Sequence, residues 1–220
     1  GSSLLGSTLV VVCLMLMLPR MAGLAGGGKA GRGTWCYLAV SWLAFGITEA
    51  AGGGHFDAWQ IGAMLLLLPW AVLIPRDWSG FAWRRDLLPW RWSMLIWWGV
   101  LVATGVAMYS PGVLDRLKFT QGLVAHSHLA MAGFTTSFCM LLIGVLTGRS
   151  AGGIFSVIAW NLAVATMIIV LAALGWREGA SAEWMTLPAP WRWSGLAVRA
   201  GCGAVMLAVS IAWLKRTRPI

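Results

Sequence analysis

The sequence has few charged residues and few histidines, and it lacks the catalytic motifs that are common in soluble enzymes. Of its 220 residues only 10% are charged and three are histidine. It has no Gly-rich phosphate loop and no H-E-x-x-H motif, and no Ser/His/Asp set can be assembled from it. The four cysteines lie in or beside apolar stretches without C-x-x-C spacing, which argues against a disulfide framework or a zinc site. These absences exclude the common classes of soluble enzyme.

Apolar residues are abundant instead. They make up 59% of the chain, and the mean hydropathy is +0.78. A net charge of +9 would suggest nucleic-acid binding in a soluble protein, but here the basic residues fall between long apolar runs. That distribution is typical of the loops of a membrane protein. We therefore expect an integral membrane protein surrounded by a lipid bilayer, and no nucleic-acid partner.

The apolar runs are long enough to cross a membrane, which takes about 20 residues as a helix, or about 17 at the short end. Seven segments are of roughly this length: Ser3–Leu18, Thr34–Ala51, Asp57–Ile74, Trp92–Tyr109, Thr120–Leu146, Ile154–Trp176 and Ser194–Leu214. Nothing in the connections marks a second domain. The sequence predicts an all-α integral membrane protein, a bundle of about seven transmembrane helices that forms a single domain over residues 1–220.

The charges of the connections predict an orientation. Basic residues are concentrated in the first connection, the third connection and the C-terminal tail: Arg20, Lys29, Arg32, Arg76, Arg84, Arg85, Arg91, Lys215, Arg216 and Arg218. The second connection carries Glu49 and Asp57 without a base, while the fourth, with Asp115, Arg116 and Lys118, fits less well. The positive-inside rule places the N-terminus outside and the C-terminus in the cytoplasm, as for a protein of the bacterial inner membrane.

Two of the three histidines, His126 and His128, lie in the first half of the fifth span. A coordinating side chain at membrane depth is costly to desolvate and is a candidate functional site. At about 100° per residue the two imidazoles leave the helix roughly 200° apart, so they cannot bind one metal ion together. One helix with imidazoles on opposite faces suits two haem groups, one on each side. Alternatively, each histidine donates a hydrogen bond to a neighbouring helix, and the small residues beside it form an ordinary packing surface.

This helix resembles a known family. The run Val124-Ala125-His126-x-His128, preceded by Thr120 and followed by small residues, is similar to the tenth helix of the catalytic subunit of haem–copper terminal oxidases. The resemblance implies that His126 ligates a high-spin haem and His128 a low-spin haem. In that family the tenth helix also enters from the outer side and is followed by two spans that end in the cytoplasm, as expected here.

The sequence also departs from that family. The oxidases have twelve core spans, a copper site of three further histidines, a tyrosine cross-linked to one of them, and another histidine for the low-spin haem. Only His55 is left here. A three-histidine copper centre cannot be built, so we expect no copper site and no oxygen reduction of that kind by this chain alone.

His55 and two arginines complete the candidate haem site. His55 precedes the third span on the same predicted membrane face as the pair, which permits a haem with two histidine ligands, although a solvated loop histidine fits its position better. Arg177 and Arg192 follow the sixth span, where the oxidase family places arginines that bind haem propionates. Bidentate pairing with carboxylates would suit them, and snorkelling to the interface is the alternative.

Three functions remain open. The first is a haem-binding membrane subunit of an electron-transfer or oxidase-like respiratory complex, which is not expected to be catalytic alone and needs other membrane subunits. The second is a cofactor-free accessory or scaffolding subunit whose histidines are hydrogen-bonded. The third is a pigment-binding or transport protein.

Overall fold

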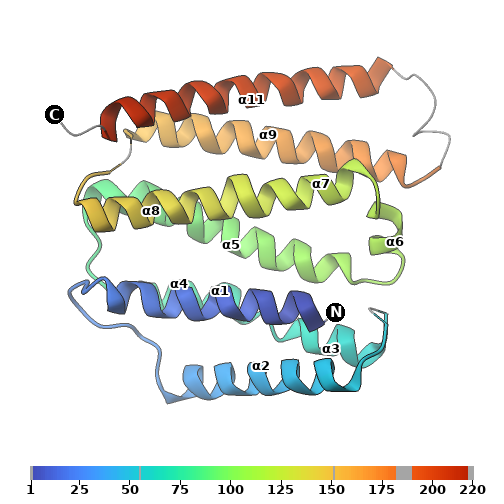
Figure 1. The fold of residues 1–220 in the computed structure, drawn as a ribbon, viewed down its shortest axis with the longest axis horizontal. Helices are drawn as coiled ribbons and strands as arrows, with labels where there is room; N and C mark the ends of the chain where they lie inside the picture. Colours follow the sequence, from blue (N-terminus) through green and yellow to red (C-terminus); the bar gives the residue numbers. More distant parts are fainter. Residues whose placement is uncertain (1, 55, 151, 182–189, 218–220) are drawn as a thin grey trace. The chain divides into compact units, whose positions relative to one another are not determined.

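The structure is a computed structural model that describes residues 2–54, 56–150, 152–181 and 190–217. Within these ranges every regular element is a helix, apart from one isolated bridge between Gly26 and Phe81 (Figure 1). The elements in chain order are α1 (Ser2–Met21), α2 (Arg32–Ala51), α3 (Ala58–Leu65), α4 (Trp70–Trp78), η1 (Arg85–Leu87), α5 (Leu88–Met108), α6 (Val113–Leu117), α7 (Gln121–His128), η2 (Leu129–Thr135), α8 (Thr136–Thr147), α9 (Ile154–Glu178) and α11 (Pro190–Thr217). The prediction of an all-α fold is confirmed.

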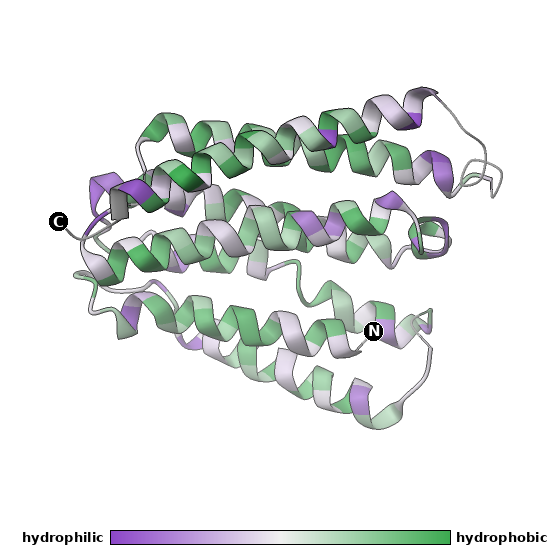
Figure 2. Cartoon of the chain, turned by 45° about the horizontal axis from the view of Figure 1, so that its top comes forward, coloured by the Kyte–Doolittle hydropathy of each residue, from purple (hydrophilic) through white to green (hydrophobic). Residues whose placement is uncertain are grey.

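Within the described residues, six stretches are long and apolar enough to cross a membrane: Ser3–Met21, Ala58–Trp78, Arg85–Met108, Gln121–Thr147, Ile154–Glu178 and Pro190–Lys215. Hydrophobic residues cover most of the length of these helices (Figure 2). Each stretch corresponds to one of the seven predicted spans. The protein is thus an integral membrane protein by the length and composition of its helices.

The remaining predicted span, Thr34–Ala51, is helical as expected but is not among these six. It forms most of α2, whose 20 residues include Trp, Tyr, Ser and Thr side chains and an acid, Glu49, near the C-terminal end. These polar groups dilute its apolar character, although its 20 residues would extend about 30 Å, the thickness of the hydrocarbon core. A seventh crossing by α2, and with it the orientation, stays a prediction.

The chain divides into two compact units. The first comprises Gly1–Arg84 and Val102–Pro111, and the second Arg85–Leu101 and Gly112–Ile220. In the first unit α1 packs against α2, α3 and α4. In the second, α9 lies between α7 and α11, with both of which it makes extensive contact (Figure 1). That the whole chain acts as a single domain stays a prediction.

The span Ala58–Trp78 is interrupted by a tightened stretch between α3 and α4. Pro69 has no N–H, and the N–H of Trp70 donates to Leu67 (3.1 Å) in place of Leu66. The carbonyl oxygen of Leu66 instead accepts a hydrogen bond from the hydroxyl of Tyr37 on α2 at 2.8 Å. A neighbouring helix thus satisfies the group that the proline leaves free, as the interior of a membrane requires.

Candidate functional site

The helix that carries the histidine pair has a well-defined beginning. The Oγ1 of Thr120 accepts a hydrogen bond from the backbone N–H of Gly122 at 3.1 Å, the usual contact of a threonine N-cap. The carboxylate of Glu178, at the C-terminal end of α9, accepts another from the N–H of Gln121 at 2.8 Å. Glu178 is only 3% exposed, so its negative charge is held against the positive end of the α7 dipole. The first contact fixes where α7 starts, and the second ties that start to the end of α9.

Two glycines let α7 and α9 approach closely. A Cβ on Gly175 of α9 would overlap the backbone nitrogen and Cα of Gly122 on α7. Since the obstacle is main chain, no change of side-chain rotamer could relieve it. Small residues at a crossing point are the usual means by which membrane helices come into contact, and here they press the N-terminal half of α7 onto α9.

His128 is held in one tautomer by its own helix. Its Nδ1 lies 2.8 Å from the carbonyl oxygen of Val124, one turn back. A carbonyl oxygen can only accept, so Nδ1 carries the proton and the lone pair of the neutral ring is on Nε2. A histidine that donates one N–H to a backbone carbonyl while the other nitrogen faces outward is the usual preparation of a metal ligand.

The two histidines lie on opposite flanks of the contact with α9. Ala125 is 3% exposed and belongs to an apolar cluster with Met167 and Leu171 of α9. Around the helix axis His126 is about 100° to one side of Ala125, and His128 about 60° to the other. Both rings are half-buried. The two histidines therefore lie on different flanks of α7, and their role as haem ligands stays a prediction.

Directly after His128 the helix widens. Residues Leu129–Thr135 form a π-helical stretch, in which the ordinary i to i−4 hydrogen bonds are displaced. The indole N–H of Trp160 on α9 donates to the freed carbonyl of Ala132 at 3.0 Å. Stretches of π-helix frequently occur at functional sites, and no proline is present to cause this one.

A polar network joins α5, α8 and α9 in the second unit, about two turns along the chain from His128. Ser93 of α5 lies 2.7 Å from the hydroxyl of Ser137 on α8 and donates at 2.7 Å to the side-chain oxygen of Asn161 on α9. The indole N–H of Trp97 donates to the same oxygen at 2.6 Å. Ser93 and Asn161 also line a groove of about 680 Å³ between α5 and α9, which is otherwise mainly apolar. These residues were missed by sequence reasoning, although Asn161 is a visible polar interruption of an apolar run.

The predicted propionate ligands have protein contacts of their own. Arg192, near the start of α11, donates to the second carboxylate oxygen of Glu178 at 3.3 Å. The guanidinium of Arg177 lies 5.3 Å from the ring centroid of Trp191. Through Glu178, Arg192 lies near the beginning of α7. The role of both arginines as haem ligands stays a prediction. His55 lies outside the described residues.

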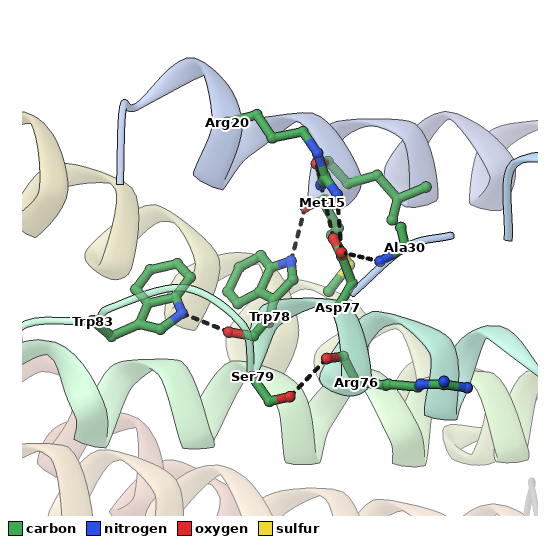
Figure 3. Close-up of polar contacts among 9 residues, drawn as sticks. Met15, Arg20, Ala30, Arg76, Asp77, Trp78, Ser79 and Trp83 are labelled. Carbon is green, nitrogen blue, oxygen red and sulfur yellow. Dashed lines mark hydrogen bonds and ion pairs between the residues drawn. The ribbon is translucent and has the colours of Figure 1, made fainter. Parts of the chain in front are cut away.

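The first unit contains a polar centre that sequence reasoning did not identify (Figure 3). Asp77, at the end of α4, is 1% exposed and receives a bidentate pair of hydrogen bonds from Arg20, at 2.7 and 2.9 Å. Its Oδ1 also accepts from the backbone N–H of Ala30 at 2.8 Å. Nearby, the indole of Trp78 donates to the carbonyl of Met15 at 2.8 Å. The signal in the sequence was an acid, one of two, within a mainly basic connection.

No group of three or more His, Cys, Asp or Glu side chains that could hold a metal ion occurs among the described residues. This leaves open whether haem is bound, since haem iron needs one or two ligands from the chain. Comparison of the sequence with family models and curated proteins, and of the fold with solved structures, found no match.

Proposed function

We propose that this chain is a haem-binding membrane subunit of an electron-transfer or oxidase-like respiratory complex. The observation that supports it best is the state of His128. Its Nδ1 proton is used by the Val124 carbonyl, so the lone pair of Nε2 remains for a metal. His126 on the opposite flank is the ligand for a second haem. Haem supplies reversible one-electron chemistry, and the chain supplies ligands, orientation and exclusion of water.

The chain's residues suit this role in three further respects. The π-helical stretch after His128 departs from ordinary helix geometry at the position where a site needs its side chains redirected. On the flank beside His128 lie the aliphatic Val124 of α7 and, one turn on, the small residue Ala132 of η2. Half-burial of both rings leaves each histidine a side that the chain does not cover. A haem there would be enclosed further by other membrane subunits, which we propose as partners.

The same proposal includes orientation and location. The basic residues of the first and third connections and of the tail favour a cytoplasmic C-terminus and an outer N-terminus. Ends on opposite sides require an odd number of crossings, so α2 would be the seventh span. A bacterial inner membrane fits this arrangement. With three histidines in the chain, we propose no copper centre and no catalysis by this subunit alone.

The test is a reduced-minus-oxidised absorption spectrum of protein isolated from its own membranes with partner subunits retained. The variants are His126→Ala and His128→Ala, with Ser127→Ala as the matched control, because Ser127 is exposed between the two histidines. We expect a haem spectrum in the wild type, loss of a different component in each histidine variant, and no loss in the control. Wild-type protein without haem would overturn the proposal.

A cofactor-free accessory subunit is the second candidate. The network of Ser93, Ser137 and Asn161 joins three helices without any cofactor, and the ring of His128 already has a partner. This alternative predicts no visible absorption and a stability change of about 1 kcal/mol on removal of a histidine. Red absorption would instead indicate a chlorophyll-type pigment.

A further inference from the structure

A positive charge lies within the last span. Arg199 belongs to α11 and to the membrane-length stretch Pro190–Lys215, and its side chain is half-buried. Among the residues that the structure describes, no carboxylate forms an ion pair with it. Ionisable side chains at membrane depth are costly and usually have a functional counter-charge. Arg199 therefore calls for an anion that the described part of the chain does not supply.

Glu178 shows how deep Arg199 lies relative to the histidines. One carboxylate oxygen of Glu178 accepts from the backbone N–H of Gln121 and the other from the guanidinium of Arg192, so the backbone of Arg192 lies within one side-chain length of the level of Gln121. His128 follows Gln121 by seven residues, and Arg199 follows Arg192 by seven. Seven residues advance a helix by about 10 Å and return to nearly the same face. His128 and Arg199 consequently lie at similar depths, to within the length of the Arg192 side chain, on two helices that run in the same direction.

Both residues also flank the same apolar cluster. Its members outside α9 are Val124 and Ala125 of α7, Ala132 of η2, and Trp191, Cys202 and Met206 of α11, and they pack with α9 residues that include Met167 and Leu171. Arg199 precedes Cys202 by three residues, which places them on one side of α11. His128 follows Val124 by four residues on one side of α7. The imidazole and the guanidinium thus border one apolar cluster shared by α7, α9 and α11.

We propose that Arg199 binds a carboxylate of the haem that His128 holds. This rests on the proposed function, and it adds a residue to the site. The guanidiniums of Arg177 and Arg192 already contact Trp191 and Glu178, whereas Arg199 has a fork of donors suited to a carboxylate. Side chains on a helix tilt toward its N-terminus, so His128 and Arg199 both lean toward the same end of the bundle.

The charge of Arg199 has a measurable consequence. Ferric haem carries one more positive charge than ferrous haem, so a nearby cation stabilises the ferrous form relative to the ferric form. Removal of the cation should lower the midpoint potential of the His128 haem. In a site with few other charges this effect is weakly screened. A haem bound by His126 on the opposite flank should be affected less.

The experiment measures the midpoint potential of each haem component in the wild type, Arg199→Gln and Arg199→Lys. Arg149→Gln is the control, because Arg149 is exposed at the other end of the second unit's spans. We expect a lower potential for the His128 component in Arg199→Gln, a value closer to wild type in Arg199→Lys, and no change in the control. Resonance Raman spectra of the Lys variant should show a shifted propionate bending band, since an ammonium cannot bind both oxygens as a guanidinium does.

The outcomes separate this inference from the proposed function. If His128→Ala removes a haem component while Arg199→Gln keeps the wild-type potential, the inference is wrong and the proposed function stands. The same holds if Arg199→Gln loses a copurifying anionic lipid or partner subunit with its potential unchanged. If Arg199→Gln does not assemble, an unshifted propionate band in Arg199→Lys overturns the inference. Wild-type protein without haem overturns both.

Discussion

Two carboxylates are buried within the described residues, Asp77 in the first unit and Glu178 in the second. Asp77, at the end of α4, accepts a bidentate pair from Arg20 and a third hydrogen bond from the peptide N–H of Ala30, so its partners lie at the end of α1 and in the connection after α1. Glu178 has a longer single contact to Arg192 and divides its oxygens between two helix starts. Asp77 thus holds the connection after α1 against the end of α4, whereas Glu178 links the end of α9 to the starts of α7 and α11.

The difference bears on which unit is the better candidate for a functional site. The centre around Asp77 includes its own counter-charge, and the guanidinium of Arg20 also lies 5.3 Å from the ring of Phe81. It therefore has no need of a further ligand. Glu178 instead contacts the backbone at the start of α7 and a side chain near the start of α11, the two helices that carry His128 and Arg199. A structural ion pair and a positioning carboxylate can thus be distinguished by what their oxygens bind.

The largest effect should come from Gly175→Ala. It tests whether the close contact of α7 with α9 contributes more stability than the hydrogen bond from Gln121 to Glu178 does. Its methyl group would overlap the Gly122 backbone, so α7 must move away from α9. We expect a loss above about 3 kcal/mol, the upper end for overpacking, measured as thermal stability and monodispersity in detergent. Gly62→Ala, which meets open space in the first unit, is the control. Equal stability of the two variants would contradict the close helix contact.

Asp77→Asn should have the next largest effect. It leaves Arg20 without its counter-charge, and because Arg20 is 28% exposed we expect a cost of about 2–3 kcal/mol, less than for a fully buried pair. Thermal unfolding of the first unit, followed by tryptophan fluorescence, measures it. Asp115→Asn provides a matched exposed acid, for which we expect little change. A loss of haem in Asp77→Asn without a loss of stability would reverse the assignment of this centre as structural.

Glu178→Gln should cost the least, about 1 kcal/mol. The amide oxygen can still accept from the Gln121 N–H, while the charge interactions with Arg192 and the helix dipole are lost. If Glu178 positions the site, haem occupancy and the potential should change more than the melting temperature does. Glu49→Gln, at an exposed acid of the first unit, is the control. Unchanged spectra together with reduced stability would show that Glu178 is only structural.

Helix positions were predictable because they depend on local composition. Each of the six membrane-length stretches overlaps a predicted span, and the fifth, Gln121–Thr147, matches the prediction Thr120–Leu146 within one residue at each end. Thr120 even serves as the N-cap, as its side chain permits. The span boundary near Arg85 was predicted too far along the chain, at Trp92, because interfacial tryptophans and arginines continue the helix before the apolar run begins.

The site was predictable only in part. His126 and His128 were found because histidines are rare in this sequence and lie two apart on one helix, which fixes their opposite directions. The tautomer of His128 and the pairing of Glu178 with Gln121 could not be found in this way, since each depends on backbone groups brought close by folding. The sequence does show Arg199 and Asn161 within apolar runs, but not their surroundings.

By itself the sequence determined that this is a helical membrane protein with a histidine pair on one span, because hydropathy and helical periodicity are properties of neighbouring residues. The tertiary structure decided which side chains donate hydrogen bonds to the backbone carbonyls that irregular helix leaves unpaired. Tyr37 completes the stretch that Pro69 interrupts, and Trp160 completes the π-helical stretch after His128. It also decided which charges meet, because in a medium without water a free carbonyl or carboxylate must find its partner on another helix.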